Sequence, residues 1–256
     1  MSTTALKIIA LILMTIDHIG RFIPGMPLLT RIIGRASRPL FAFCAVQGFE
    51  HTSDRDNYLK RMYIFSVITG VMNFALNSIY PDAYHTLSGN IFSSLFIAFF
   101  IINTGFYGAN LARLAYVLIF NTVVHNFVAG NFSANLLNIT DAIFPEIFHC
   151  EGSILFFALV AALYRGRESK KETAEAFGCY CLVYLVLVLL ANTPVYTSSP
   201  LPLMQLLFSY SIQWLQILAL PLMLLYNGKK GPGLKYFFYI YYPLHSAVLF
   251  VLGNTF

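Results

Sequence analysis

Long apolar segments alternate with short polar ones along almost the whole chain. A helix needs about 20 mostly apolar residues to cross a bilayer, and segments of this kind leave no stretch that reads as a soluble domain. We therefore expect an all-α, polytopic bundle of about nine spanning helices (eight to ten) in a single domain over residues 1–256. The candidate spans are residues 5–24, 33–50, 61–80, 90–106, 111–129, 151–165, 176–193, 203–226 and 236–256.

The composition supports this interpretation. Hydrophobic residues make up 58% of the chain and charged residues only 11%, whereas an ordinary soluble domain carries about 25% charged residues. This excludes a monomeric cytosolic enzyme, a disordered protein and a nucleic-acid binder. Four cysteines do not form a disulfide framework, and the Cys179-x-Cys181 pair lacks the second ligand pair of a zinc site, so no metal is expected.

The distribution of Lys and Arg predicts the orientation of the bundle, because basic loops stay on the cytoplasmic side. A bundle of nine helices with a cytoplasmic N-terminus, in a bacterial inner membrane, satisfies this rule for most of the basic residues. Four arginines between the first two predicted helices break the rule: Arg21, Arg31, Arg35 and Arg38. Either they are needed there for function, or the predicted position of the first helix is wrong. The basic loops are 51–61, 165–172 and 227–235, and the loops without Lys or Arg are 81–90, 130–150 (which can add a re-entrant or interfacial helix) and 194–202.

Ionisable residues inside a membrane are costly, and they mark functional sites by default. Asp17 and His18 lie about 20 Å along the first predicted helix. Asp17 is expected to face Arg21, one turn further on. Two interpretations of the pair stay open at this point. The first is a helix-end ion pair beside a buried structural histidine, and the second makes His18 a general base.

Two arginines lie near the start of the second predicted helix, in the segment Gly34-Arg35-Ala36-Ser37-Arg38-Pro39. Pro39 suits the first turn of a helix. Arg35 and Arg38 would then lie at an N-terminal turn, where a guanidinium group can bind a phosphate or a developing oxyanion. The alternative is that both side chains only reach to the membrane interface.

Further polar residues open or interrupt the later helices. Asn90 and Glu151 each begin a predicted helix, where they are either caps or site residues. His245 lies near mid-membrane, next to Pro243, which is expected to kink the helix. In the predicted topology most of these groups share the outer half, which favours a polar cavity that opens outward. Three more histidines lie on or near that side and can line the entrance of the cavity: His85, His125 and His149. The sequence favours none of them over the others as a site residue.

The sequence resembles the TraX family in a set of short motifs. Each motif is short, but the motifs occur in order and span most of the chain. They are Leu6-Lys7-Ile8-Ile9-Ala10 leading into Asp17-His18-Ile19, Gly34-Arg35 with Pro39-Leu40-Phe41, Gly89-Asn90-Ile91-Phe92, Glu151-Gly152 with a following helix that ends Tyr164-Arg165, and Tyr242-Pro243-Leu244-His245.

The resemblance implies both an activity and a site. TraX-like proteins look similar to a wider group of membrane acyltransferases, which includes acyltransferase-3 enzymes and lysosomal glucosaminide N-acetyltransferase. The resemblance therefore implies that an acetyl group passes from cytosolic acetyl-CoA to an acceptor on the far side of the membrane. It also implies that His18 is the catalytic residue. Residues 81–88, 130–150 and 194–202 show no family motif. The pilin acetylation of the founding member is therefore not carried over, and the acceptor stays open between a sugar, a peptide N-terminus and a lipid headgroup.

The sequence prediction is thus an acetyl-CoA-dependent acyltransferase in contact with membrane lipid, whose self-association is left open. We expect His18, Asp17, Arg35 and Asn90 to be catalytic, either by direct transfer or through an acetyl-His18 intermediate. Two rivals are kept, a proton-coupled transporter with an Asp17, His18 and His245 relay, and a non-catalytic assembly factor. The residues expected to bind the donor are His245, Arg38, Glu151 and Tyr242.

Overall fold

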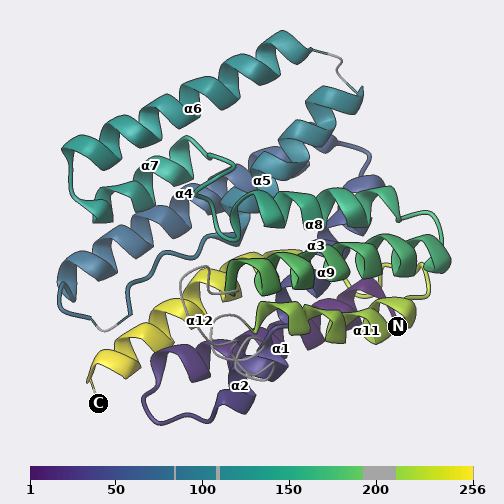
Figure 1. Ribbon diagram of the computed structural model, residues 1–256, viewed down its shortest axis with the longest axis horizontal. Coiled ribbons are helices and arrows are strands. Elements are labelled where there is room, and N and C mark those ends of the chain that lie inside the picture. The colour runs from purple at the N-terminus through teal and green to yellow at the C-terminus, as the bar shows by residue number, and fades with distance from the viewer. Residues whose placement is uncertain (84, 108–109, 193–211, 256) are drawn as a thin grey trace. The chain divides into compact units, whose positions relative to one another are not determined.

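The computed structural model describes residues 1–83, 85–107, 110–192 and 212–255 (Figure 1). Within these ranges the chain forms helices joined by turns and contains no strand, so the all-α prediction is confirmed. The helices are α1 (Thr3–Phe22), α2 (Leu28–Gly34), α3 (Ser37–Glu50), α4 (Arg55–Ile79), α5 (Ile91–Ile102), the π-helix η1 (Asn103–Tyr107), α6 (Leu111–Asn131), the 3₁₀-helix η2 (Ala134–Leu136), α7 (Leu137–Ile143), α8 (Ser153–Arg165), α9 (Lys170–Asn192), the 3₁₀-helix η3 (Gln213–Ala219), α11 (Leu220–Leu224) and α12 (Lys235–Thr255).

Five of the described helices are long and apolar enough to cross a membrane: α1, α4, α6, α9 and α12. Others are apolar but shorter. Helix α8, for example, has 13 residues, which is about 20 Å at 1.5 Å per residue and less than the roughly 30 Å of a hydrocarbon core. Several expected spans therefore correspond to helices that are shorter than a full crossing.

The long helices expose apolar side chains along one face, as a helix in contact with lipid does. On α6, Ile119, Val123 and Phe127 are exposed at intervals of four residues. Ile64 and Ile68 repeat the pattern on α4. Residues four apart share a helix face, and a continuous apolar face of this kind marks a membrane or protein contact.

The expected helix 33–50 is wrong in its continuity, because the chain forms α2 and α3 with a turn between them. Pro39 explains the break. Its nitrogen carries no hydrogen, so it cannot donate to the carbonyl of Arg35, and this missing bond disfavours a continuous helix there. The break places Arg38 and Pro39 in the first turn of α3, as the sequence predicted.

The expected helix 203–226 is also interrupted, although residues 203–211 lie outside the described residues. The rest forms η3 and then α11. Pro221 stands at the junction and cannot donate to the carbonyl of Ile217, so a tighter 3₁₀ turn precedes it. In the expected span 90–106, α-helix gives way to η1 after Ile102.

By the contacts within the chain, the structure divides into two compact units. Unit 1 takes Met1–Arg21, Gly25–Cys44 and Ala162–Gly233, and unit 2 takes Phe22–Pro24, Ala45–Ala161 and Leu234–Phe256. Because the termini of α3 and α8 fall in different units, each of these helices contributes to both. The single-domain prediction stays a prediction, and each unit is described by itself.

In unit 1 the start of α1 is tied to the loop that follows α11. The backbone nitrogen of Thr3 donates to the carbonyl of Lys229 at 2.9 Å, and the hydroxyl of Thr4 donates to that of Lys230 at 2.9 Å. The rings of Phe43 and Tyr226 pack edge to face, with 5.5 Å between centroids. These contacts fix the N-terminal half of α1 before it reaches Asp17.

In unit 2, α4 contacts α5, α7 and α12, and α7 lies between α4 and α6 (Figure 1). The close approach of α7 to α4 depends on Gly70, because a Cβ atom there would collide with the Cβ of Ala142 and the carbonyl of Asn138. The rings of Phe49 and Phe99 stack at 4.6 Å in the core of this unit. Residues 130–150 therefore contain a short helix, α7, which packs against α4 and α6.

Candidate functional site

A buried aspartate in unit 1 is held by two arginines. Asp17 on α1 is 9% exposed. The Nη1 atom of Arg31 donates to Asp17 Oδ2 at 2.7 Å and to its main-chain carbonyl at 2.9 Å, and Arg35 forms a second ion pair with Oδ1. Both arginines come from α2 and the turn after it, whereas the expected pairing of Asp17 with Arg21 stays a prediction.

The contact between α2 and α1 requires a residue without a side chain at position 34. A Cβ atom on Gly34 would collide with the side chain of Asp17. Gly34 therefore lets the end of α2 approach α1 closely enough for Arg31 and Arg35 to reach the carboxylate. This gives a physical reason for the Gly34-Arg35 motif noted in the sequence.

Arg35 links three parts of unit 1. Its Nε donates to the carbonyl of Arg31 at 3.0 Å, its Nη1 to Gln213 Oε1 at 2.7 Å, and its Nη2 to Asp17. A guanidinium group has five N–H donors, so these contacts use three of them. Arg35 is thus paired with Asp17, and its predicted contact with a phosphate or a developing oxyanion stays a prediction.

His18 and Arg38 also belong to unit 1. His18 follows Asp17 on α1 and is partly buried, and Arg38 is partly buried in the first turn of α3. Four of the eight predicted site residues therefore share this unit. Their catalytic and donor-binding roles stay predictions.

Asn90 in unit 2 is the N-cap of α5. Its Oδ1 accepts from the backbone nitrogen of Ser93 at 3.2 Å, and its Nδ2 donates to the carbonyl of Ser66 at 3.0 Å. Both ends of the amide therefore hold the start of α5 against α4. To stabilise an oxyanion, Asn90 would have to exchange the bond to Ser66 for one to substrate.

Tyr242 and Glu151 meet at the same helix start. The hydroxyl of Tyr242 donates to Glu151 Oε2 at 3.1 Å and accepts from the backbone nitrogen of Ile91 at 3.0 Å. A Cβ on Gly89 would lie 3.2 Å from the same carboxylate oxygen. Three motif segments that are far apart in the sequence, those around residues 90, 151 and 242, are thus brought together. The polar cavity that the sequence predicted for a larger set of residues stays a prediction.

His245 lies one turn beyond Tyr242 on α12, which continues through Pro243. It is buried, and its Nδ1 donates to the carbonyl of Tyr241 at 2.9 Å. This contact fixes the orientation of the ring. Its proposed part in donor binding or proton transfer stays a prediction.

Unit 2 also contains a pocket of about 610 Å³. Its walls come from α4, the segment before α5, α6, α7 and the loop that precedes α8. Most of its lining residues are polar, and they include Asn90 and Glu151 from the predicted site. Other side chains of the lining are Asn73, Asn77, Asn135, Asn138, Ser93, His125, Asp141, His149 and Cys150.

Two histidines in this pocket are each held by a carboxylate. His125 Nδ1 lies 2.7 Å from Asp141 Oδ1, and His149 Nδ1 lies 2.8 Å from Glu146 Oε2. The two imidazole rings stack on each other, with 4.0 Å between centroids and 13° between planes. The sequence predicted only that such histidines can line an entrance, and it missed both carboxylate partners.

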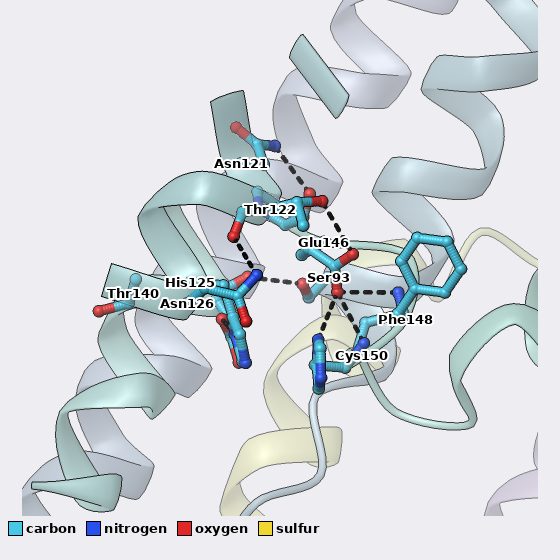
Figure 2. Close-up of polar contacts among 12 residues, drawn as sticks. Ser93, Asn121, Thr122, His125, Asn126, Thr140, Glu146, Phe148 and Cys150 are labelled. Atoms are coloured by element: carbon cyan, nitrogen blue, oxygen red, sulfur yellow. Dashed lines mark hydrogen bonds and ion pairs between the residues drawn. The ribbon is translucent and has the colours of Figure 1, made fainter. Parts of the chain in front are cut away.

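Glu146 is almost completely buried, and Figure 2 shows the contacts around it. Besides His149, its carboxylate accepts from the hydroxyl of Thr122 at 3.1 Å and from the backbone nitrogens of Phe148 and His149 at 2.8 Å each. Asn121, one residue before Thr122, donates to the carbonyl of Pro145 at 2.7 Å. The loop is therefore fastened to α6, and the buried charge is compensated by hydrogen bonds.

One sequence signal pointed to this cluster. Glu146 and His149 are three positions apart in the loop before α8, so the two side chains are within reach of each other along the chain. No such signal existed for His125 and Asp141, which are 16 residues apart. Their contact depends on how α6 turns back onto α7.

Burial changes the acidity of two groups in the pocket. It raises the pKa of the Asp141 carboxyl, and the hydrogen bond from His125 opposes this only in part. Burial also raises the pKa of the Cys150 thiol to about 11, against a smaller opposite effect from Ser94. Cys150 is therefore a protonated, unreactive thiol at neutral pH.

The pocket does not suit the donor. Its described lining contains no Lys or Arg, whereas the phosphates of coenzyme A call for cationic partners. A metal site is not formed either: among the residues that the structure describes, no group of three or more His, Cys, Asp or Glu side chains is placed to hold a metal ion.

Comparisons with known proteins identify a family and a distant relative. The model of the family described as TraX protein matches residues 2–253. The chain is also 28% identical to the probable fimbrial assembly protein FimC, serogroup H1, of Dichelobacter nodosus, over 97% of this chain and 94% of that protein. No solved structure matches the chain. Because the family match covers nearly every residue, the chain belongs to the TraX family.

Proposed function

We propose that this protein is an acyltransferase embedded in the inner membrane, which moves an acetyl group from cytosolic acetyl-CoA to an amine or hydroxyl on the outer face. The proposal includes a bundle of about nine crossings with a cytoplasmic N-terminus, as the basic loops favour. Membership of the TraX family supports it.

The observation that carries the proposal is the ion-pair cluster beside His18. Charged residues inside a spanning helix are costly, by up to about 2.5–3.5 kcal/mol at the helix centre on insertion scales. Asp17 lies on α1, a helix of spanning length, immediately before His18, and it pairs with Arg31 and Arg35 from α2 and the turn after it. Such a cluster holds the adjacent turn of α1 in one orientation, which is what a base needs in order to act on a bound substrate.

In the proposed reaction, the neutral imidazole of His18 takes the proton of the acceptor amine or hydroxyl. The acceptor nitrogen or oxygen then bonds to the thioester carbonyl, the carbon–sulfur bond breaks, and the thiolate of coenzyme A receives the proton. Arg35 keeps two N–H donors for the oxyanion or the thioester. Arg38 is proposed to meet an anionic part of the donor.

Acetyl-CoA binding and transfer test this proposal with purified protein in lipid nanodiscs. We expect the native protein to bind acetyl-CoA, and His18→Ala to keep binding but lose acetyl transfer by a factor of about 10²–10⁴. His51→Ala is the matched control, because His51 is an exposed histidine in the turn after α3. Full transfer by a well-folded His18→Ala protein would remove His18 from the mechanism.

A second function is favoured by the relative's name, which includes fimbrial assembly. As a non-catalytic assembly factor, this protein would bind a fimbrial component and use its polar clusters only for packing. In that case no acetyl-CoA would bind, and His18→Ala would lower the unfolding temperature but change no activity. If the native protein carried protons across a liposome membrane and bound no acetyl-CoA, the result would favour the transporter.

A further inference from the structure

The pocket in unit 2 has the size of a small-molecule site. At about 610 Å³ it falls within the range of cavities that hold organic ligands. Its lining combines apolar side chains, such as Leu87, Leu137 and Ala142, with polar ones. A ligand with both a short apolar body and a polar end suits such a mixed lining.

The charge of the lining is one-sided. Asp141 and Glu151 contribute carboxylates, while no Lys or Arg is found among the described lining residues. An anionic ligand would meet only like charge there. The electrostatics therefore favour a cationic ligand.

Most asparagines of the lining have used both N–H groups of their amide. Asn77, Asn90, Asn135 and Asn138 each donate to two oxygens of the protein, and Asn73 donates to one and keeps a second N–H. What these side chains mainly still offer is oxygen acceptors, as on Asn73 and Asn138. The bonds run from Asn73 to Gly89 O (3.1 Å), from Asn77 to Leu87 O (2.8 Å), from Asn90 to Ser66 O (3.0 Å), from Asn135 to Phe74 O (3.0 Å) and from Asn138 to Asn135 O (3.1 Å).

The histidines add acceptors of the same kind. An ionised carboxylate can only accept, so the Nδ1 atoms of His125 and His149 must carry the hydrogens of their bonds to Asp141 and Glu146. In a neutral imidazole the other nitrogen, Nε2, is then an acceptor. The two carboxylates thus select the tautomer that presents acceptors on both rings.

We propose that this pocket binds an organic ligand through a protonated primary amine. An ammonium group supplies three donors and a positive charge, and the lining offers carboxylate, imidazole and amide acceptors with no competing cation. Asp141 is the central partner, because it lines the pocket and also orients His125. The inference goes beyond acyl transfer and does not depend on it.

Tyramine tests the proposal, because it carries a short apolar ring and a primary ammonium. Two analogues of similar size serve as controls: N-acetyltyramine, which is neutral, and 4-hydroxyphenylacetate, which is anionic. Binding is measured by calorimetry on the full chain in nanodiscs at pH 7, without acetyl-CoA. We expect tyramine to bind at least about tenfold more tightly than either analogue, since charge-assisted bonds are the ones at stake.

Variants then locate the site. Asp141→Asn and Glu151→Gln should each weaken tyramine binding about tenfold or more, whereas Asp56→Asn, on an exposed aspartate of α4, should not. Trialanine amide with a free N-terminus, compared with its N-acetylated form, shows whether the ammonium of a chain end binds as well as a free amine. Equal binding of tyramine and N-acetyltyramine, or tyramine binding that survives both pocket variants, would overturn the proposal. Because the assay contains no donor, a protein that fails to transfer acetyl groups can still pass it.

Discussion

The imidazole of His125 lies flat against that of His149, with 4.0 Å between the ring centroids. One ring belongs to α6 and the other to the loop that precedes α8. Each is held by a carboxylate from a different segment, Asp141 on α7 and Glu146 in the loop. The stack therefore joins three segments at one wall of the pocket, and its geometry depends on every one of these bonds.

The buried carboxylate of Glu146 is the first test of that arrangement. Glu146→Gln removes the negative charge that the bonds from Thr122, Phe148 and His149 share, so charge-assisted hydrogen bonds become weaker neutral ones. We expect a loss of about 1–3 kcal/mol in unfolding free energy, measured by denaturant unfolding in detergent. Asp82→Asn is the control, since Asp82 is exposed. An unchanged stability for Glu146→Gln would mean that the loop is not fastened through this carboxylate.

Gly70 gives a second prediction, because α7 reaches α4 only over its bare Cα. Gly70→Ala should push α7 away and cost about 1–3 kcal/mol through overpacking, and it should also weaken tyramine binding, since α7 carries Asp141. Gly130→Ala on α6 is the matched control, because no atom lies within 4 Å of a Cβ there. If both variants unfolded at the same temperature, the close approach of α7 to α4 would be refuted.

Cys150 gives a pH-dependent prediction. Only the thiolate is alkylated, and burial raises the pKa of this thiol to about 11. The thiolate fraction is therefore roughly one in a thousand at pH 8, and the alkylation rate should rise about tenfold per pH unit from pH 7 to pH 10. Mass spectrometry of a Cys44→Ser, Cys179→Ser, Cys181→Ser protein measures it. A rate that levels off below pH 9 would contradict the burial of the thiol.

The ion pairs of Asp17 give a fourth prediction. Asp17→Asn leaves Arg31 and Arg35 without a counter-charge in a partly buried place, which should cost about 3 kcal/mol in unfolding free energy. Asp17→Asn combined with Arg31→Gln should recover part of this loss, because one uncompensated charge is removed. A double-mutant cycle by thermal unfolding measures the coupling. Strict additivity of the two substitutions would show that the residues do not interact.

Much of this protein could be predicted from residue patterns alone. Long apolar segments dictate helices of spanning length, because a backbone without water must pair its own polar groups. The break at Pro39 could also have been anticipated, since a proline lacks the hydrogen that a continuous helix needs there. The polar residues Asp17, Arg35, Asn90, Glu151 and Tyr242 stood out for the same physical reason, which is the cost of placing them in an apolar segment.

Only the tertiary structure decided which of those groups meet. The contact of Asp141 with His125, 16 residues away in the sequence, depends on how α6 folds back over α7. The stacking of His125 on His149 likewise depends on how α6 packs against the loop before α8, whereas Glu146 and His149 are near neighbours in the sequence. A sequence pattern reports the neighbours within a few turns of one helix. Contacts between segments 14 to 151 residues apart, such as Arg31 with Asp17 or Tyr242 with Ile91, arise from packing around Gly34, Gly70 and Gly89. Two segments approach closely at these positions because glycine has no Cβ atom. Whether a Cβ atom would collide with a neighbour can be judged only when the facing atoms are known.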